Sequence, residues 1–420
     1  MTAISLALDP GLAIEAAPAP SAEAPFEVHE LFFSRTDAAG IIQAGNDVFQ
    51  RVSAYEWDEL IGKPHKIVRH PDTPRAVFWL LWDTIGQGRP IGAYVKNRAK
   101  DGRHYWVFAI VTPVDGGYLS VRLKPTSPLL AVVKQEYAAL AAAERAEGIA
   151  PPAAAAALLL RLGEIGFADY PSFMSAALGQ EIAARDKALG RQPDATGTMF
   201  EALSATAQSL LRQSEIIASA FASYANVPFN FRVLAAQLGR EGAAISIISG
   251  NYGALSAEMQ RVLARFVAAA QDVFRTINDG FFLLGTARMQ RELRCFFAEE
   301  ESEGEGGTGQ SREREMALLD AQQRAYRAKA LDGLREISRT AVDFEATCVE
   351  MNRLAAGLEV TRVMGKVECA RHTHARDRMD ELLGDLETFQ RTIAAALKEI
   401  DTMNRDIQSR ADGLLIGAAA

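Results

Sequence analysis

Cysteine is scarce in this chain of 420 residues. The three cysteines are Cys295, Cys348 and Cys369, and no two of them form a C-x-x-C pair. This spacing excludes a disulfide framework and a zinc ribbon, and it favours a reducing compartment. We therefore expect a cytoplasmic protein.

Long hydrophobic runs are also lacking. The best candidate, A-A-A-A-A-L-L-L at 153–160, ends at Arg161. It is well short of the roughly 20 apolar residues that a spanning helix requires, so we expect no membrane span. The first 25 residues are rich in Ala and Pro and have no basic n-region. They predict a disordered leader and not a signal peptide.

The chain has no excess of positive charge, since 45 Lys and Arg stand against 53 Asp and Glu and the net charge is −8. A surface that binds nucleic acid needs a basic field, so no nucleic-acid partner is expected.

Signatures of catalysis are missing too: there is no P-loop, no G-x-S-x-G, no H-E-x-x-H, and no histidine-kinase or cyclase motif. The sequence therefore predicts a protein that is not an enzyme.

The most distinctive stretch is H-K-I-V-R-H-P-D-T-P at 65–74. Prolines at 64, 71 and 74 exclude a continuous helix, so a shaped, largely rigid loop is expected. The cations at 63, 66, 69 and 75 are opposed only by Asp72. Such a loop suits an anionic ligand, although a plain surface loop whose side chains bond to neighbouring carbonyls is the alternative.

Short apolar runs around this loop predict strands. The runs 31–34 and 41–44 flank a hairpin turn at 37–40, where Gly40 can take positive φ. Residues 105–114 are apolar on both faces, as in a central strand, and 118–123 follow across a turn. Asn46 precedes a short helical pattern, and its side chain is expected to cap that helix. These patterns predict an α+β domain built on a mixed antiparallel sheet.

Three blocks of this region resemble the PAS domain of aerotaxis-type receptors. They are F-F-S-R-T-D-A-A-G-I-I-Q-A-G-N-D-V-F at 32–49, E-L-I-G-K-P-H-K-I-V-R-H-P-D-T-P at 59–74 and V-K-N-R-A-K-D-G-R-H-Y-W-V at 95–107. In that family the domain holds FAD non-covalently and reports its redox state. The resemblance implies that Asn46, Arg69, His70 and Asp72 bind the cofactor. Where the family usually has P-W-x-G before the V-K-N-R strand, this chain has Ile91, so an aromatic residue often found beside the flavin is missing.

From about 129 the chain is rich in alanine and helical in pattern. At least three amphipathic helices are expected up to about 192, separated near 148–152 and 168–172. They are interpreted either as a linker that transmits a signal or as a plain spacer bundle. Residues 226–249 resemble a degenerate form of the signalling region of methyl-accepting chemoreceptors, with Pro228 interrupting the helix. The acidic, Gly-rich segment 299–311 predicts a flexible linker.

Two apolar seams in the last hundred residues predict a helical hairpin. The first steps by three and four from Leu334 to Leu358, and the second runs from Leu382 to Ile407. We expect the chain to turn at 357–365 and around His372 and His374, which are read as surface histidines and not metal ligands. Cys348 lies on the first seam and reads as a core residue.

These observations predict the following domains: leader 1–25, PAS domain 26–126, helical linker module 127–194, chemoreceptor-like helices 195–298, linker 299–311 and second helical hairpin 312–411. The predicted function is a cytoplasmic redox or oxygen sensor with FAD and with chemotaxis proteins or chemoreceptors as partners. The alternatives are an adaptor with an empty PAS module, and a PAS sensor for haem or a small metabolite. The two helical halves are expected to form one antiparallel four-helix bundle within a chain able to exist as a monomer, the alternative being association between chains.

Overall fold

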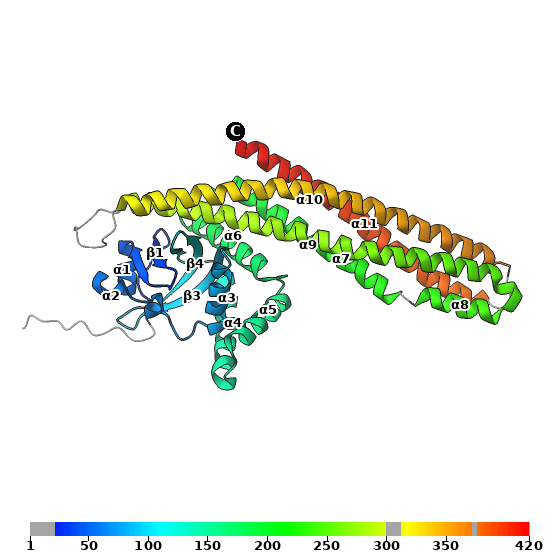
Figure 1. The fold of residues 1–420 in the computed structure, drawn as a ribbon, viewed down its shortest axis with the longest axis horizontal. Helices are drawn as coiled ribbons and strands as arrows, with labels where there is room; N and C mark the ends of the chain where they lie inside the picture. The colour runs from blue at the N-terminus through cyan, green and yellow to red at the C-terminus, as the bar shows by residue number, and fades with distance from the viewer. Residues whose placement is uncertain (1–21, 193, 225, 300–311, 372–375, 420) are drawn as a thin grey trace, which may run out of the picture. The chain divides into compact units, whose positions relative to one another are not determined.

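The computed structural model describes residues 22–192, 194–224, 226–299, 312–371 and 376–419 (Figure 1). Their contacts separate them into two compact units. The first unit takes the described residues of 1–161 and 290–319, and the second those of 162–289 and 320–420. Each unit is described by itself.

The first unit is built on a five-stranded antiparallel sheet in the order β2-β1-β5-β4-β3. Its strands are β1 (Leu31–Asp37), β2 (Ile42–Gly45), β3 (Ile91–Arg98), β4 (His104–Val114) and β5 (Gly117–Leu123). The two predicted hairpins are confirmed, because β1 pairs with β2 and β4 with β5. Gly40 has the expected positive φ of 78° in the first turn.

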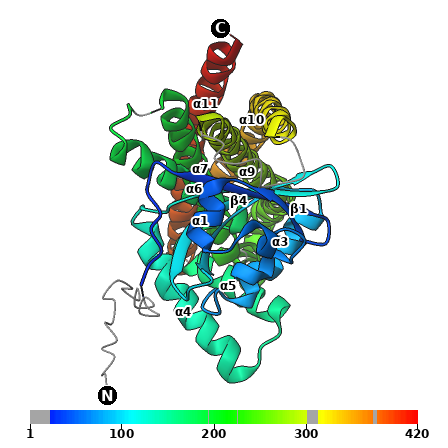
Figure 2. The same ribbon diagram turned by 90° about the vertical axis from the view of Figure 1, so that its left-hand side faces the viewer.

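Short helical elements connect β2 to β3: α1 (Asp47–Ser53), α2 (Trp57–Leu60), the 3-10 turn η1 (His65–Val68) and α3 (Arg75–Gly86). The loop 65–74 therefore breaks the helix, as its prolines predict. α1 and α3 lie over the same face of the sheet. Both helices and the strand β1 are labelled in Figure 2. The expected side-chain cap by Asn46 is wrong. Its side chain makes no cap hydrogen bond to α1, because its amide is bound to the backbone of β1.

The three helices predicted between 129 and 192 are present as α4 (Leu129–Glu147), α5 (Pro151–Glu164) and α6 (Tyr170–Ala188). In the first unit α4 packs beside β4. The rings of Tyr137 and Trp106 are 6.3 Å apart, and the Lys134 Nζ lies 5.5 Å from the Trp106 ring.

Residues 290–299 and 312–319 also belong to the first unit, and they contact the side of the sheet opposite α1 and α3. Phe33 of β1 meets Phe297 edge to face at 5.3 Å. The buried Arg35, also on β1, donates to both carboxylate oxygens of Glu315 at 2.8–3.0 Å. A bidentate pair of this kind positions the helix end more precisely than apolar contact alone.

The second unit is helical. After α6 it contains α7 (Ala195–Ser223), α8 (Val227–Gln237), the 3-10 turn η2 (Gly239–Gly242) and most of three long helices, α9 (Ala243–Glu299), α10 (Arg312–Cys369) and α11 (Arg376–Ala419). One continuous core joins α7, α8, α9, α10 and α11. Phe266 of α9 packs on Phe344 of α10 at 4.8 Å, and Phe221 of α7 packs on Phe389 of α11 at 4.9 Å.

The two predicted seams are both in that core, and the helical halves pack on each other within the chain. Asn404 of α11 donates to the carbonyl of Ala341 on α10 at 2.8 Å. The turn expected at 357–365 is wrong, because α10 continues unbroken to Cys369. Gly365 has no side chain, and this allows Leu383 of α11 to pack closely against α10. The prediction for His372 and His374 and most of the predicted linker 299–311 lie outside the described residues.

The fold class predicted from the sequence, an antiparallel sheet with short helices followed by a mostly helical region, is confirmed. Among the described residues, no helix combines the length and the apolar character needed to cross a bilayer.

Candidate functional site

A cavity of about 220 Å³ lies in the first unit between the sheet, α3 and the turn at 64–69. Side chains alternate between the two faces of a strand, so every second residue of the sheet faces this space. On β5 these are Tyr118, Ser120 and Arg122, whereas Leu119 and Val121 are fully buried between them and do not line the cavity. α3 contributes the apolar side chains Phe78, Leu81, Trp82 and Ile85.

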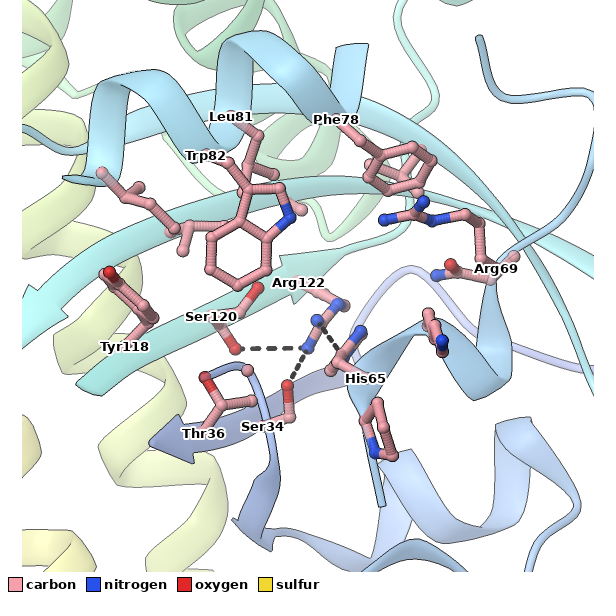
Figure 3. Close-up of a pocket in the computed structure, with 18 of the residues that line it drawn as sticks. Ser34, Thr36, His65, Arg69, Phe78, Leu81, Trp82, Tyr118, Ser120 and Arg122 are labelled. Atoms are coloured by element: carbon pink, nitrogen blue, oxygen red, sulfur yellow. Dashed lines mark hydrogen bonds between the residues drawn. The ribbon is translucent and has the colours of Figure 1, made fainter. Parts of the chain in front are cut away.

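Arg122 is the centre of the polar wall. Its Nη1 donates to the hydroxyl of Ser34 at 2.8 Å, and its Nη2 lies 2.7 Å from the Nε2 of His65 (Figure 3). Its guanidinium also lies over the rings of Phe32 and Phe49, at 5.5 and 5.8 Å. Burial lowers the pKa of Arg122 to about 10. The arginine remains a cation at neutral pH, and none of its partners among the described residues is a carboxylate.

His65 accepts the hydrogen bond from Arg122, because a guanidinium only donates. Burial, followed by the charges of Arg122 and Arg69, holds the pKa of His65 well below its ordinary value. The imidazole is therefore neutral, with its proton on Nδ1. A cation that is buried against a neutral imidazole and a hydroxyl attracts an electron-rich or anionic ligand.

Arg69 places a second guanidinium at the cavity. It stacks on Phe78 with its Cζ 3.5 Å from the ring centroid, and burial lowers its pKa. Its Nε is buried and has no hydrogen-bond partner among the residues that the structure describes. A buried donor without a partner costs about 1–3 kcal/mol, which a ligand acceptor at this position would recover.

Trp82 forms the outer rim of the cavity. It is 41% exposed, and its indole meets Tyr118 edge to face at 5.6 Å. Gly40 lies directly beneath it, since a Cβ at Gly40 would stand 2.8 Å from the indole ring. Figure 3 shows Trp82 and Leu81 descending from α3 towards the sheet residues that face them.

The other residues expected to bind the cofactor, Asn46, His70 and Asp72, do not line the cavity. Asn46 is buried and links two backbone groups of β1, accepting from Phe33 N and donating to Leu31 O, each at 3.1 Å. The structure therefore brings Arg69 to the cavity and places Asn46 beside the edge of β1, the strand that carries Ser34.

Asp72 attaches the loop to β3 through its side chain, and His70 does so through its backbone N–H, which donates to Lys96 O at 3.4 Å. Asp72 accepts from the Nζ of Lys96 at 2.8 Å, and this bond lowers the pKa of its carboxyl. The backbone N–H of Asp72 donates to the Nδ1 of His70 at 3.1 Å, and burial lowers the pKa of that imidazole. Thr73 completes the attachment through its hydroxyl, which bonds both the N–H and the carbonyl of Lys96.

Sequence reasoning missed Arg122 and the specific role of His65. One signal was present, because Ser120 and Arg122 alternate with Leu119, Val121 and Leu123 on a strand that is otherwise apolar. Polar residues at every second position of a buried strand indicate a polar cavity on that face.

A buried carboxylate connects α3 to α4. Glu144 of α4 accepts hydrogen bonds from the backbone N–H groups of Arg75 at 2.8 Å and Ala76 at 2.9 Å, the first residues of α3. The N-terminus of a helix carries partial positive charge and open donors, so this carboxylate caps the helix that lines the cavity.

A second cavity, of about 520 Å³, lies between α6, α7 and α9 in the second unit. Four of its charged groups are paired with one another: Arg288 donates to Asp186 at 2.6 and 2.7 Å and lies 3.6 Å from Asp194, and Arg191 lies 3.7 Å from Asp186. In the cavity of the first unit, Arg122 and Arg69 have no carboxylate partner in the described part of the chain, so this cavity is the stronger candidate for a ligand site.

Comparisons with known proteins concern the first unit. Residues 44–121 match the family described as the PAS fold. The aerotaxis receptor of Escherichia coli (strain K12) is 43% identical over 121 residues, which are 28% of this chain and 24% of that protein. The nitrogen fixation regulatory protein of Klebsiella pneumoniae is 32% identical over 81 residues, 19% of this chain and 16% of that protein.

A crystal structure of the PAS domain of a protein from Colwellia psychrerythraea shares 20% identity and covers 23% of this chain and 86% of that one, with a TM-score of 0.20. The chain spans about a quarter or less of the length of the two curated relatives. The family match assigns residues 44–121 to a PAS domain.

Proposed function

We propose that the protein is a cytoplasmic sensor that binds FAD in the cavity of its PAS domain and signals through its helical region, without catalysis. The observation that carries the proposal is the presence of two guanidinium groups, the buried one of Arg122 and the partly buried one of Arg69, at one aromatic-walled cavity. The similarity to an aerotaxis receptor supports it.

The residues present fit a flavin. Its ring system is flat and carries carbonyl oxygens and ring nitrogens that accept hydrogen bonds, and the cavity offers Arg122 and the open Nε of Arg69 as donors. Phe78 and Trp82 provide apolar surface on the opposite wall. The volume lies below the roughly 300–1,000 Å³ of sites for drug-sized ligands, so it suits a ring system and not a whole dinucleotide.

When bound, FAD supplies reversible redox chemistry. Arg69 donates directly to the ligand, and Arg122, held by His65 and Ser34, does the same from the sheet. Asn46, His70 and Asp72 are positioning residues: Asn46 holds β1, Asp72 holds the loop against β3, and the ring of His70 accepts from Asp72 N within the loop.

Two routes lead from the cavity to helices. The first runs through α3 to Glu144 and thus to α4, which belongs to the segment expected to transmit the signal. The second crosses the sheet, from Ser34 on the cavity face of β1 to its neighbour Arg35, which binds Glu315 of α10. Chemotaxis signalling proteins or chemoreceptors are the proposed partners of the helical output.

A test is the absorption spectrum and cofactor content of the purified protein. A yellow protein with an oxidised-flavin spectrum and released FAD is the expected result. A Soret band would show that the cofactor is haem and not FAD. A colourless protein that binds no added FAD would support the adaptor function instead.

Limited proteolysis between 129 and 192, compared in oxidised and reduced samples, tests the route through α4. Identical cleavage in the two samples would contradict that route.

One observation favours a smaller ligand as the second candidate. Ile91 stands where the family usually has an aromatic residue, and it is fully buried opposite Val111 without lining the cavity. A metabolite with one acidic group would satisfy Arg122 and fill about 220 Å³. Calorimetry with FAD and with small carboxylic acids separates the two.

A further inference from the structure

The cavity between α6, α7 and α9 in the second unit contains a carboxylate that takes no part in the ion pairs of that cavity. Glu201 of α7 lines the cavity. Among the described residues, no hydrogen bond or ion pair reaches its carboxylate, and burial raises the pKa of this group. The side chain nevertheless stays accessible from the cavity. A carboxylate that is partly dehydrated and still accessible is suited to hold a ligand.

The distances around Gly179 of α6 show where this carboxylate lies. A Cβ at Gly179 would stand 3.6 Å from the Oε1 of Glu201 and 2.7 Å from the ring of Phe281. The Glu201 side chain therefore reaches from α7 towards α6 and ends near the Phe281 ring of α9. Phe281 is 8% exposed and stacks on Phe200 with the ring centroids 5.8 Å apart, so its position is fixed by packing.

The cations of the cavity do not compensate Glu201. Both arginines of the cavity are held by the buried Asp186. The remaining cation, Lys187, is exposed and lies eight residues after Gly179, which is about 12 Å further along α6. The cavity therefore has an end where cations and carboxylates are already paired, and an opposite end where Glu201 is the charged group.

Apolar side chains line the space beside Glu201. Ile182 of α6 and both Phe281 and Leu284 of α9 face the cavity. Its volume of about 520 Å³ lies within the roughly 300–1,000 Å³ that is typical of sites for small molecules. Apolar walls lower the local dielectric, so a positive charge beside Glu201 is attracted more strongly than it would be in water.

We propose that this cavity binds a small organic cation, a primary amine on an aromatic or alkyl body, with its ammonium group on Glu201 and its body against Phe281 and Leu284. An ammonium group close to the face of Phe281 also gains a cation–π interaction. An anion would meet the open carboxylate of Glu201, and the arginines that could attract it already bind carboxylates. The site lies wholly in the second unit, so it does not depend on the ligand of the PAS domain.

Gly197, in the first turn of α7, keeps the cavity open. The atoms nearest to a Cβ at this position would be those of the Asp194 side chain at 3.6–3.8 Å, which is ordinary van der Waals contact. Close packing therefore does not require a glycine here, and a larger side chain has room to enter the cavity. Gly197→Leu should fill the site without weakening the helix, because leucine forms helix better than glycine.

The first test compares three ligands that share an indole body and differ in charge: tryptamine, the neutral alcohol tryptophol and the anion indole-3-acetate. Calorimetric titration of the full-length protein at pH 7 is expected to show one tryptamine per chain, with tryptophol and indole-3-acetate at least about 10-fold weaker. No binding of tryptamine, or equal affinity for all three ligands, would overturn the proposal.

The second test removes the charge of Glu201. Glu201→Gln keeps the shape of the side chain, and the affinity for tryptamine should fall by about 10-fold or more while the helical circular dichroism signal is retained. The matched control is Glu215→Gln, which neutralises an exposed carboxylate of α7 that does not line the cavity. Wild-type affinity in Glu201→Gln would refute the role of this carboxylate.

The third test locates the ligand. Gly197→Leu should abolish the binding of tryptamine and leave the FAD content unchanged. Its control is Gly384→Leu, at an exposed glycine of α11 where a Cβ would meet no atom within 4 Å. Gly384→Leu should bind tryptamine like the wild type. If Gly197→Leu also bound it like the wild type, the ligand would lie elsewhere and the proposal would be wrong.

Discussion

Glu144 binds the first turn of the cavity helix: its Oε1 accepts a hydrogen bond from the backbone N–H of Ala76 at 2.9 Å, although the two residues are 68 positions apart. The same carboxylate accepts from Arg75 N, and it is almost completely buried. A helix that follows the PAS domain in sequence thereby holds the helix that carries Phe78 and Trp82.

Removal of this cap should weaken the first unit. Glu144→Ala leaves two backbone donors of α3 without their acceptor, and we expect a loss of about 1–3 kcal/mol in the free energy of unfolding. Urea denaturation measures it. Glu147→Ala, an exposed carboxylate on the same helix, should change stability by less than about 0.5 kcal/mol, and an equal loss in both variants would refute the specific cap.

Arg69 should dominate the affinity for the flavin among the loop residues. Arg69→Ala removes a charge-assisted bond worth about 1.5–3 kcal/mol, so FAD affinity should fall roughly 10- to 150-fold while the fold is retained. Lys63→Ala removes a cation that does not line the cavity and should have little effect. Titration with FAD followed by fluorescence measures both, and stoichiometric FAD in purified Arg69→Ala would argue against the assignment.

His65 should make the first unit sensitive to acid. Its pKa in the folded protein is depressed, whereas the unfolded chain binds the proton below about pH 6.5. Stability is therefore fully present above pH 6.5 and falls as the pH drops below it, by at most about 1.4 kcal/mol per pH unit.

His65→Gln keeps an acceptor for Arg122 without the titration, and its stability should fall less between pH 7 and pH 5. Burial lowers the pKa of His70 and His104 as well, so part of the acid sensitivity should remain. Thermal unfolding across this range measures the difference, with the exposed His29→Gln as the control. Superimposable pH profiles of wild type and His65→Gln would contradict this role.

Gly40 should control the position of Trp82. Gly40 and Gly62 share a φ of 78°, but only at Gly40 would a Cβ meet a neighbour, at 2.8 Å from the Trp82 ring. Both Gly→Ala changes should cost about 1 kcal/mol through backbone strain, and Gly40→Ala should in addition shift the tryptophan emission and weaken ligand binding. Identical spectra and affinities for the two variants would show that the contact with Trp82 has no effect.

The sequence alone determined the local structure. Alternation and turn glycines predict the β1–β2 and β4–β5 hairpins, the prolines of 64–74 predict a loop, and the three-four spacing of the seams predicts α10 and α11. These features depend on neighbours along the chain, whose geometry is periodic. A resemblance carried by whole blocks of residues also indicated the PAS domain.

Only the tertiary structure decided which polar residues meet. A loop broken by prolines has no period, so nothing in it distinguishes Arg69, which lines the cavity, from Asp72, which is held outside by Lys96. Arg122 and Ser34 are 88 positions apart, and strand pairing alone brings them together. The side chain of Asn46 does not cap its helix, because it forms hydrogen bonds with two backbone groups of β1 instead.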